Sequence, residues 1–317
     1  MTTTASIAQS PARAPSRYAR QIASWVDTHR APVSSSERIQ WLRTLPLLTL
    51  HLVALVGIWF MPVSWLDVTV AIGLYLTRMF AITGFYHRYF SHKSFRTGRV
   101  HQFLWAVVGA SATQRGPLWW AAIHRQHHRA ADTADDPHNS RRGFWWSHIG
   151  WFLAEKHFAT NLDRVRDWAR FPELVWLDRF DSAVPFALAV LLFGAGELIA
   201  NLAPGLTNGW QLLFWGFVVS TLVLIHVTLC INSLAHKVGT RRHDTDDDSR
   251  NSPVLALLTL GEGWHNNHHK YCGSMRQSHR RREIDITYGV LRGMERLGLI
   301  WDAKPVPQRL LEAGERS

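Results

Sequence analysis

Four long apolar segments stand out from the polar stretches that separate them. A helix needs about 20 apolar residues to cross the hydrocarbon core of a bilayer, and these segments are close to that length. Short polar turns at 62–65 and 203–209 join them in two pairs. The pattern therefore predicts four transmembrane helices arranged as two hairpins, over residues 45–63, 66–86, 183–202 and 210–231.

Two of these segments run without a break into side chains that can bind metal. The second leads directly into His87, and the fourth leads into Asn232 and His236, which are four residues apart and share a helical face. We therefore expect both pairs of helices to deliver ligands where their second member leaves the membrane. Arg78 lies inside the second segment, where a charge is costly. It either faces the helix bundle or reaches back to the interface.

The remaining regions predict a helical layer beside the membrane. Residues 100–112 are apolar but too short to span, which indicates an interfacial or cap helix, and residues 119–151 are rich in Trp, His and Arg, as is typical of headgroup depth. We expect 163–181 to be a solvated connection and 240–250, with its four aspartates, an exposed charged loop. Residues 284–301 have helical apolar spacing and predict an amphipathic packing helix.

Charge and topology narrow the choice of partners. The chain has 317 residues, with 35 Lys and Arg against 24 Asp and Glu, a net charge of +11. This charge favours a lipid bilayer surface, an acidic redox partner or a phosphorylated substrate, and we find no nucleic-acid-binding motif. Lys and Arg lie in the long loops and not in the two short turns, so both termini and the metal-binding segments are expected in the cytoplasm, at a bacterial inner membrane or an endoplasmic-reticulum-type membrane.

The ends of the chain predict no packed structure. Residues 1–36 lack the apolar core of a secretory signal, which leaves a transit peptide or a disordered tail, and we favour the tail. We divide the chain into a flexible tail at 1–40, a membrane domain at 41–302 and a second tail at 303–317. The only cysteines are Cys230 and Cys272, so no disulfide framework is expected.

Histidine is concentrated in three short clusters. Two of them have the spacing His-x-x-His-His, which places three imidazoles on one face of a helix. In the first cluster His87 and His92 are five residues apart, about 140° on an ideal helix, so we expect the chain to bend near Ser91. The clusters contain His87 and His92; His124, His127 and His128; and His265, His268 and His269.

The number of ligands predicts two metal ions. With His236 and Asn232 the set comprises nine imidazoles and one amide, too many for one ion of four to six ligands. A single histidine is more often a helix cap or a satisfied core residue. Three spaced clusters converging with His236 are not explained in that way, and neutral imidazoles suit a borderline transition metal.

The clusters and their surroundings resemble the membrane fatty acyl desaturases. The spacing of the three histidine boxes is similar, and the segments 136–144, 232–236 and 261–266 resemble those of the stearoyl-CoA desaturase branch. The resemblance extends from about Leu45 to Asp302. It implies an all-α integral membrane protein with four transmembrane helices under a cytosolic helical cap that holds a di-metal centre. The implied ligands are His87, His92, His124, His127, His128, His236, His265, His268 and His269, with Asn232 as a weak, water-mediated ligand.

The same resemblance implies the chemistry. Two ferrous ions would use O2 as co-substrate to remove two hydrogens from a fatty acyl chain. The carrier is expected to be coenzyme A, with a carrier protein or an intact lipid as the alternatives. The product is a cis double bond. Because the chain has no nucleotide-binding glycine motif and no haem motif, the electrons are expected from an external donor such as a ferredoxin, a cytochrome or a flavin reductase.

Two other readings remain open, and the substrate contacts are weakly predicted. A hydroxylase could use the same di-iron scaffold, and a metal-binding transporter or sensor belongs to a different class, although it would place ligands inside the spans rather than at their exits. Candidate substrate contacts are aromatic residues that could line a tunnel and arginines that could hold a phosphorylated carrier. They are Arg115, Trp119, Trp120, Arg142 and Trp264.

Overall fold

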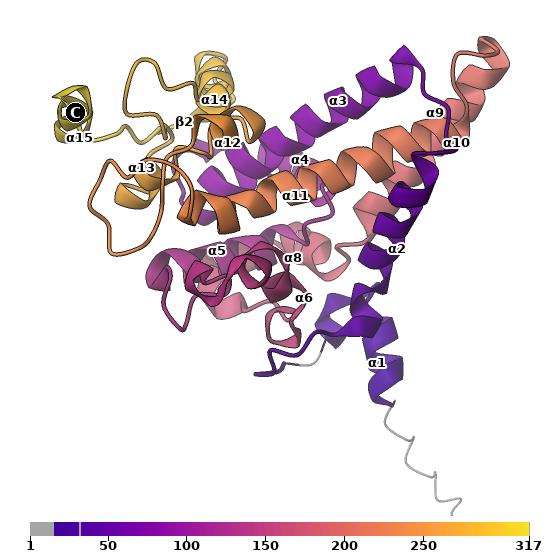
Figure 1. Cartoon of the computed structure of the whole chain (residues 1–317), viewed down its shortest axis with the longest axis horizontal. Helices are drawn as coiled ribbons and strands as arrows, with labels where there is room; N and C mark the ends of the chain where they lie inside the picture. The colour runs from indigo at the N-terminus through magenta and orange to yellow at the C-terminus, as the bar shows by residue number, and fades with distance from the viewer. Residues whose placement is uncertain (1–15, 32, 317) are drawn as a thin grey trace, which may run out of the picture.

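A computed structural model describes residues 16–31 and 33–316, and most of them are helical. The long helices project from one side of a body built of shorter helices (Figure 1). The only strands among the described residues, β1 and β2, form one antiparallel pair. In chain order the elements are α1 (Arg17–Ala23), η1 (Thr28–Arg30), α2 (Trp41–Gly57), α3 (Trp65–Phe80), η2 (Ala81–Ser91), β1 (Arg96–Thr97), α4 (Arg99–Ala110), α5 (Pro117–Ala130), η3 (Ser140–Arg142), η4 (Trp146–Gly150), α6 (Trp151–Leu153), η5 (Glu155–His157), η6 (Leu162–Val165), α7 (Arg166–Ala169), α8 (Pro172–Arg179), α9 (Ala183–Leu202), α10 (Gly209–Leu212), η7 (Leu213–Val219), α11 (Ser220–Ser233), η8 (Leu234–His236), α12 (Pro253–Leu258), α13 (His265–Lys270), α14 (Ile286–Arg296), β2 (Ile300–Trp301) and α15 (Gln308–Arg316).

Three continuous helices are long and apolar enough to cross a membrane. They cover Trp65–Ser91, Ala183–Leu202 and Gly209–His236, which correspond to the second, third and fourth apolar segments of the sequence. The helix in the first segment, α2, has 17 residues and ends at Gly57, before the end predicted from the apolar run. Length and composition therefore support three spans, and α2 is a shorter apolar helix.

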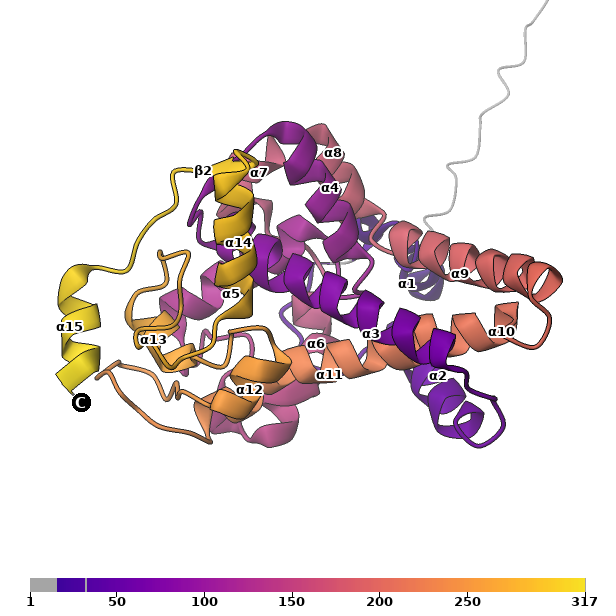
Figure 2. The same cartoon turned by 90° about the horizontal axis from the view of Figure 1, so that it is seen from above.

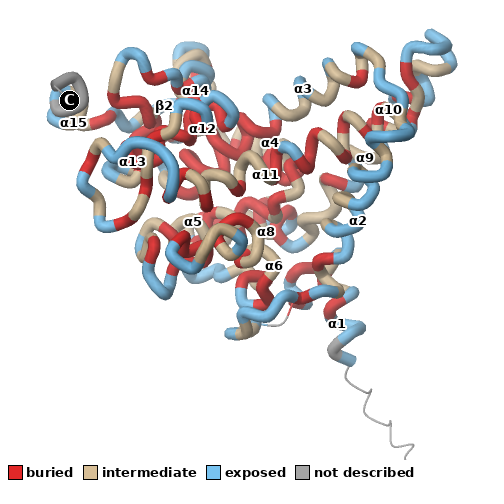
Figure 3. Tube along the Cα trace, viewed as in Figure 1, coloured by how far each residue is buried: buried red, intermediate tan, exposed pale blue. Residues whose placement is uncertain are grey.

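The projecting helices carry their apolar side chains on the outside. Seen from above, α2, α3 and α9 extend away from the body, with α10 and α11 between them (Figure 2). Their outer faces are exposed (Figure 3), and the exposed side chains include Leu55, Phe60, Ile72, Phe186 and Leu198. Such a large exposed apolar surface is typical of contact with lipid.

The distal turns of the two hairpins hold each other in register. Ser64 caps the first turn of α3, and it shares a reciprocal capping box with Asp67. Thr207, in the other turn, donates its hydroxyl to Asp67 Oδ1 at 2.6 Å. The indole of Trp215 donates to the carbonyl of Pro62 at 2.8 Å.

Arg78 faces the helix bundle and not the interface. Its side chain is buried, and its guanidinium donates to Thr221 Oγ1 at 2.7 Å and to Ser220 Oγ at 2.6 Å. It also donates to the carbonyls of Leu74 and Ser111. Because no carboxylate among the described residues pairs with it, the cation is stabilised by neutral oxygens from α11 and its neighbours.

The prediction that residues 163–181 form a solvated connection is wrong. They form η6, α7 and α8, and Val165, Leu174 and Leu177 are almost completely buried in the main core. Asp178 is only 1% exposed and accepts hydrogen bonds from Trp119 N at 2.7 Å and Thr160 Oγ1 at 2.6 Å. Its charged neighbours in the sequence hid an apolar helical face.

The ends of the described chain contain more structure than the sequence predicted. Residues 1–15 of the expected tail lie outside the described residues, but α1 follows them, and Asp27 forms an ion pair with Arg179 of α8 at 2.8 Å. At the other end the carbonyl of Lys304 accepts from Met275 N before α15 begins.

Candidate metal centre

A π-helix brings the first two histidines together. Residues 81–91 form η2, and the amide of His92 donates to the carbonyl of His87 at 3.2 Å. This i→i+5 bond places the two residues one turn apart on one face, whereas an α-helix would separate them. Their ring centroids are 4.9 Å apart. A widened helix, and not the bend expected from the sequence, therefore brings His87 and His92 onto one face in spite of their five-residue spacing.

The two His-x-x-His-His segments lie on α5 and α13, and each divides its rings between two groups. In what we call the five-histidine group, all ligand nitrogens lie within 4.8 Å of one another, and the same holds for the four-histidine group. The five-histidine group is His87, His92, His124, His128 and His268; the four-histidine group is His127, His236, His265 and His269.

The ring nitrogens face one another at distances that suit a metal. Facing Nε2 atoms are 2.8–3.2 Å apart, as in the pairs His92–His124, His127–His269 and His236–His265. Nitrogens bound to one ion at about 2.0–2.1 Å lie roughly 2.9–3.4 Å apart when their bonds make angles of 90–110°. Each group therefore has the dimensions of a mononuclear nitrogen site.

The protons on the rings support the same conclusion. His127 donates Nδ1–H to Asp136 at 3.0 Å, and His269 donates Nδ1–H to Asp247 at 2.7 Å. A carboxylate only accepts, so in this tautomer each ring presents the lone pair of its Nε2 atom to the other. These two lone pairs face each other at 3.2 Å. Two acceptors at this distance repel unless a cation lies between them, so the residues fit a bound metal ion.

Carboxylates orient four of the nine rings. His236 donates to Asp132 at 2.8 Å, and His87 donates to Glu262 at 2.5 Å. Together with Asp136 and Asp247 these contacts form the carboxylate–histidine arrangement that is typical of metal sites, because the outer partner fixes the tautomer and raises the basicity of the ligand. Among the described residues, His265 Nδ1 is buried without a partner.

Burial keeps the imidazoles neutral. It lowers the pKa of five ring systems well below the ordinary value, and the neighbouring rings lower it further, for His92, His124, His128, His265 and His268. Burial alone would raise the pKa of the outer aspartates, but their histidine partners lower it below the ordinary range. These five rings are therefore neutral and available to a metal, and the outer aspartates are ionised.

Asp247 corrects the prediction that residues 240–250 are an exposed charged loop. Its side chain is largely buried, and it accepts from His269 as well as from Ser249 N and Thr245 Oγ1. Asn266, beside His265, accepts from the backbone of His243 at 2.7 Å and so holds the loop over the site. Only part of this charge run is solvated.

Two glycines allow the third histidine segment to approach its neighbours. Gly261 has φ +133°, and a Cβ there would lie 2.5 Å from Asp285 Oδ1. A Cβ on Gly263 would lie 2.0 Å from Ala256 N, against the backbone of α12. Any larger residue at these positions would displace Glu262 and the start of α13.

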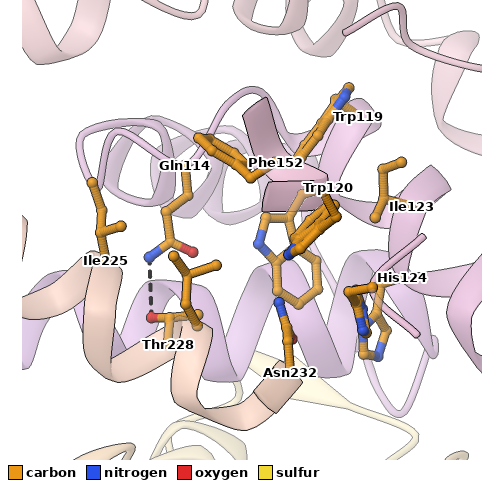
Figure 4. Close-up of a pocket in the computed structure, with 12 residues that line it drawn as sticks. Gln114, Trp119, Trp120, Ile123, His124, Phe152, Ile225, Thr228 and Asn232 are labelled. Atoms are coloured by element: carbon orange, nitrogen blue, oxygen red, sulfur yellow. Dashed lines mark hydrogen bonds between the residues drawn. The ribbon is translucent and has the colours of Figure 1, made fainter. Parts of the chain in front are cut away.

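Two small, mainly apolar cavities lie beside the two groups. One cavity of about 40 Å³ is lined by His87, His124, His127, His265 and Asn232, among others. A second, of about 50 Å³, shares Trp120, His124, Thr228 and Asn232 with the first (Figure 4). Across it, Gln114 Nε2 donates to Thr228 Oγ1 at 3.0 Å. Asn232 thus lies beside the groups, and no described contact makes it a ligand.

A larger groove lies next to the second cavity. Phe152 lines both the second cavity and a groove of about 810 Å³. The groove is bordered by Leu47 and Leu50 of α2 and by Phe186 of α9. Its polar end contains Arg43 and the ion pair of Arg115 with Asp181, 2.6 Å long.

Of the five predicted substrate contacts, three line the described cavities and two do not. Trp119 and Trp120 line the second cavity, and Arg115 lines the groove. Arg142 instead pairs with Glu37 at 2.9 Å and covers the ring of Trp146. Trp264 donates its indole N–H to the carbonyl of Ile284 at 2.8 Å and lines none of the described cavities, so its contacts are those of packing.

Comparison with known proteins decides the family. The sequence model of the fatty acid desaturase family matches residues 63–282. This chain belongs to that family. It is 36% identical over 275 residues to an sn-1 stearoyl-lipid 9-desaturase of Anabaena variabilis, covering 86% of this chain and 96% of the relative.

The names of other relatives specify different acyl carriers. An acyl-CoA C20 Delta5-desaturase of Anemone leveillei is 34% identical over 251 residues, covering 78% of this chain and 76% of the relative. A hex-5-enoyl-[acyl-carrier protein] acetylenase of Moorena producens is 30% identical over 310 residues, covering 90% and 94%. The desaturase is therefore an oxidoreductase of lipid metabolism that desaturates fatty acyl chains.

Analysis of the sequence missed the acidic residues of this desaturase centre. Glu262 precedes a box by three residues, and Asp132 and Asp136 follow another within eight, so proximity was an available signal. Asp247 had none, because 22 residues separate it from His269. His138 was also missed; it contacts Asp136 at 3.7 Å and forms a third small cluster with His127.

Proposed function

We propose that this desaturase binds two iron ions, one in each histidine group, and inserts a cis double bond into an acyl chain lying in the adjacent cavities. The supporting observation is the pair of Nε2 atoms of His127 and His269, which face each other at 3.2 Å and suit a cation bound between them. The ligands would be the nine histidines of the two groups, with Asn232 as a weak, water-mediated ligand. Bound iron would supply O2 activation and the removal of two hydrogens, with O2 reduced to water.

The protein would position the acyl chain and exclude water from it. Ile225 and Leu229 of α11 line the second cavity together with Phe152. Trp120 stacks on His124 with ring centroids 5.0 Å apart, so an extended chain would pass beside the ligand ring. The Gln114–Thr228 hydrogen bond crosses this cavity and narrows it. Holding two adjacent methylenes in reach of the metals is the entropic part of catalysis.

The acyl chain is proposed to enter from the membrane as part of a lipid, with acyl-CoA as the alternative to be tested. The groove is bordered by α2 and α9, and Phe186 on its rim is 72% exposed. Its apolar lining therefore opens where lipid tails would lie. Arg43 at the polar end has no ion-pair partner among the described residues and offers a cation to a headgroup phosphate.

Topology and electron supply belong to the same proposal. α2 would be a fourth, short span, and the lack of Lys and Arg in the distal turns supports a cytoplasmic position for the histidine groups and both termini. An external redox protein of ferredoxin, cytochrome or flavin reductase type would deliver the electrons, since the chain carries no motif for a redox cofactor of its own.

Expression in a host that makes no unsaturated fatty acids tests this function. Lipid analysis should show products two mass units lighter than the saturated chains, whereas a gain of sixteen would indicate hydroxylation. His265→Ala should abolish the product without preventing expression, and a fully active variant would contradict the assignment. Purified protein given either stearoyl-CoA or a stearoyl glycerolipid in nanodiscs would identify the carrier.

A further inference from the structure

The two histidine groups differ in the charge around them. Three of the four rings in the four-histidine group donate Nδ1–H to a carboxylate. The pairs are His127 with Asp136, His236 with Asp132, and His269 with Asp247. In the five-histidine group one described ring does so, that of His87, whose partner is Glu262. The outer anions are therefore concentrated on the group with fewer ligands.

Counter-charges increase this difference. Arg88 binds Glu262 Oε1 through Nε and Nη2, at 3.3 and 3.0 Å, and Gln277 donates to its other oxygen at 2.6 Å. Arg88 also pairs with Asp285 at 3.0 Å. One buried guanidinium is thus shared by two carboxylates, and it compensates the charge of Glu262 in part.

The carboxylates of the four-histidine group have no such neutralisation. Asp132 accepts from Ser140 and from the amide of Asp248, and Asp247 accepts from Ser249 N. No Lys or Arg in the part of the chain that the structure describes forms an ion pair with Asp132, Asp136 or Asp247. Neutral donors hold these anions in place, and the nearest cation, Arg141, acts on Asp132 and Asp247 without a direct ion pair.

We propose that the two metal positions are electrostatically unequal, and that the four-histidine group stabilises the higher metal charge. This inference rests on the proposed function, because it concerns two bound iron ions. All ligands being neutral imidazoles, the outer carboxylates supply the difference between the groups. An outer carboxylate also raises the basicity of the ring that it orients, and its loss costs about 10–100-fold in metal affinity.

A stepwise oxidation of the full chain, reconstituted with 57Fe(II) in nanodiscs, measures the inequality. A one-electron oxidant of the ferricyanide type takes one electron from each ion, and Mössbauer spectra follow ferrous and ferric iron. We expect two separate one-electron steps. Asp247→Asn keeps an acceptor for His269 but removes the charge, so the ferric-to-ferrous ratio of the first step should fall about tenfold, which is 59 mV for one electron.

Two variants locate the effect. Glu262→Gln should shift the second step and leave the first in place. Asp163→Asn is the control, because its carboxylate is 79% exposed, pairs with Arg166 at 2.6 Å and contacts no described histidine. It should change neither step. Equal shifts of both steps in Asp247→Asn, or a shift of the second step alone, would overturn the inference.

A second measurement needs no variant. Partial removal of iron with a chelator, followed by anomalous diffraction at the iron edge, shows which position keeps its ion. Higher occupancy in the four-histidine group is expected, and higher occupancy in the five-histidine group would overturn the proposal. Failure of the proposed function looks different, because the untreated protein would then hold fewer than two iron ions.

Discussion

Replacing Asp178 by asparagine is expected to stabilise the protein at neutral pH. This carboxyl group lies in the core of the body, 1% exposed, where burial raises its pKa to about 6 against the opposing hydrogen bonds from Thr160 and the amide of Trp119. Asparagine has the same shape and keeps an oxygen for the Trp119 amide. It never ionises, so it avoids the cost of a buried charge.

The size of the effect follows from the shift in pKa. The pKa of Asp178 rises by 2.2 units, from the ordinary 3.8 to about 6. At 1.36 kcal/mol per unit, ionising the buried carboxyl lowers the free energy of unfolding by about 3 kcal/mol. Because the folded pKa is the higher one, the folded state binds more protons between these values, and its stability falls as pH rises through that window. In the variant the hydrogen bond with Thr160 is weaker, which lowers its stability by about 1 kcal/mol. Above pH 6 the variant is therefore expected to be more stable than the unmodified protein by about 2 kcal/mol.

Thermal unfolding in detergent micelles at pH 4 and pH 7.5 measures this difference. The variant should melt roughly 4 °C above the unmodified protein at pH 7.5. The two should converge, or change order, at pH 4, where both side chains are neutral. Asp163→Asn, at a side chain that is 79% exposed, is the control and should show no such dependence. A variant less stable than the unmodified protein at pH 7.5 would refute the reasoning.

Three further substitutions test how the site is built. Gly263→Ala should remove most of the bound iron, since its Cβ would lie 2.0 Å from a backbone nitrogen, whereas Gly289→Ala, with nothing within 4 Å of the added Cβ, should retain it. Thr228→Val removes the acceptor of Gln114 in the second cavity and should scatter the position of the double bond, as read by mass spectrometry of the products. Arg78→Met leaves two buried hydroxyls without their donor and should cost about 2–5 kcal/mol in detergent unfolding.

Each of these expectations has a contradicting result. Equal iron content in the two glycine variants would show that the tight packing behind the third box is not required. A single unchanged double-bond position would remove the Gln114–Thr228 hydrogen bond from the account of positioning. Unfolding of the Arg78 variant within 0.5 kcal/mol of the unmodified protein, the usual size of a surface effect, would mean that the buried cation adds no stability.

The grouping of the histidine rings on shared helical faces could be predicted because helical spacing is a local property. His124 and His128 lie one turn apart on α5, and their approach to His268 follows once both helices face the same space. Their division between two groups could not be predicted, since it depends on how α5 and α13 cross. The π-helix at Ala81–Ser91 was also hidden, because the composition of this segment does not distinguish a π-helix from an α-helix.

Contacts distant in the sequence explain the remaining errors. Asp132 and His236 are 104 residues apart, and nothing in either local sequence indicates the other. Asp178 was read as solvated because charged residues surround it, although the helical face that carries it is apolar. Burial of polar groups is set by tertiary packing, and a pattern of charge along the chain reports only what local exposure would favour.

The iron content of the purified full chain tests the central claim most directly. Protein grown with ample iron, quantified by amino-acid analysis and measured by inductively coupled plasma mass spectrometry, should contain two iron ions per polypeptide. The account predicts that His92→Ala and His265→Ala, one from each histidine group, each lower that number toward one. One ion or fewer in the unmodified protein, or an unchanged count in both variants, would contradict a two-metal centre.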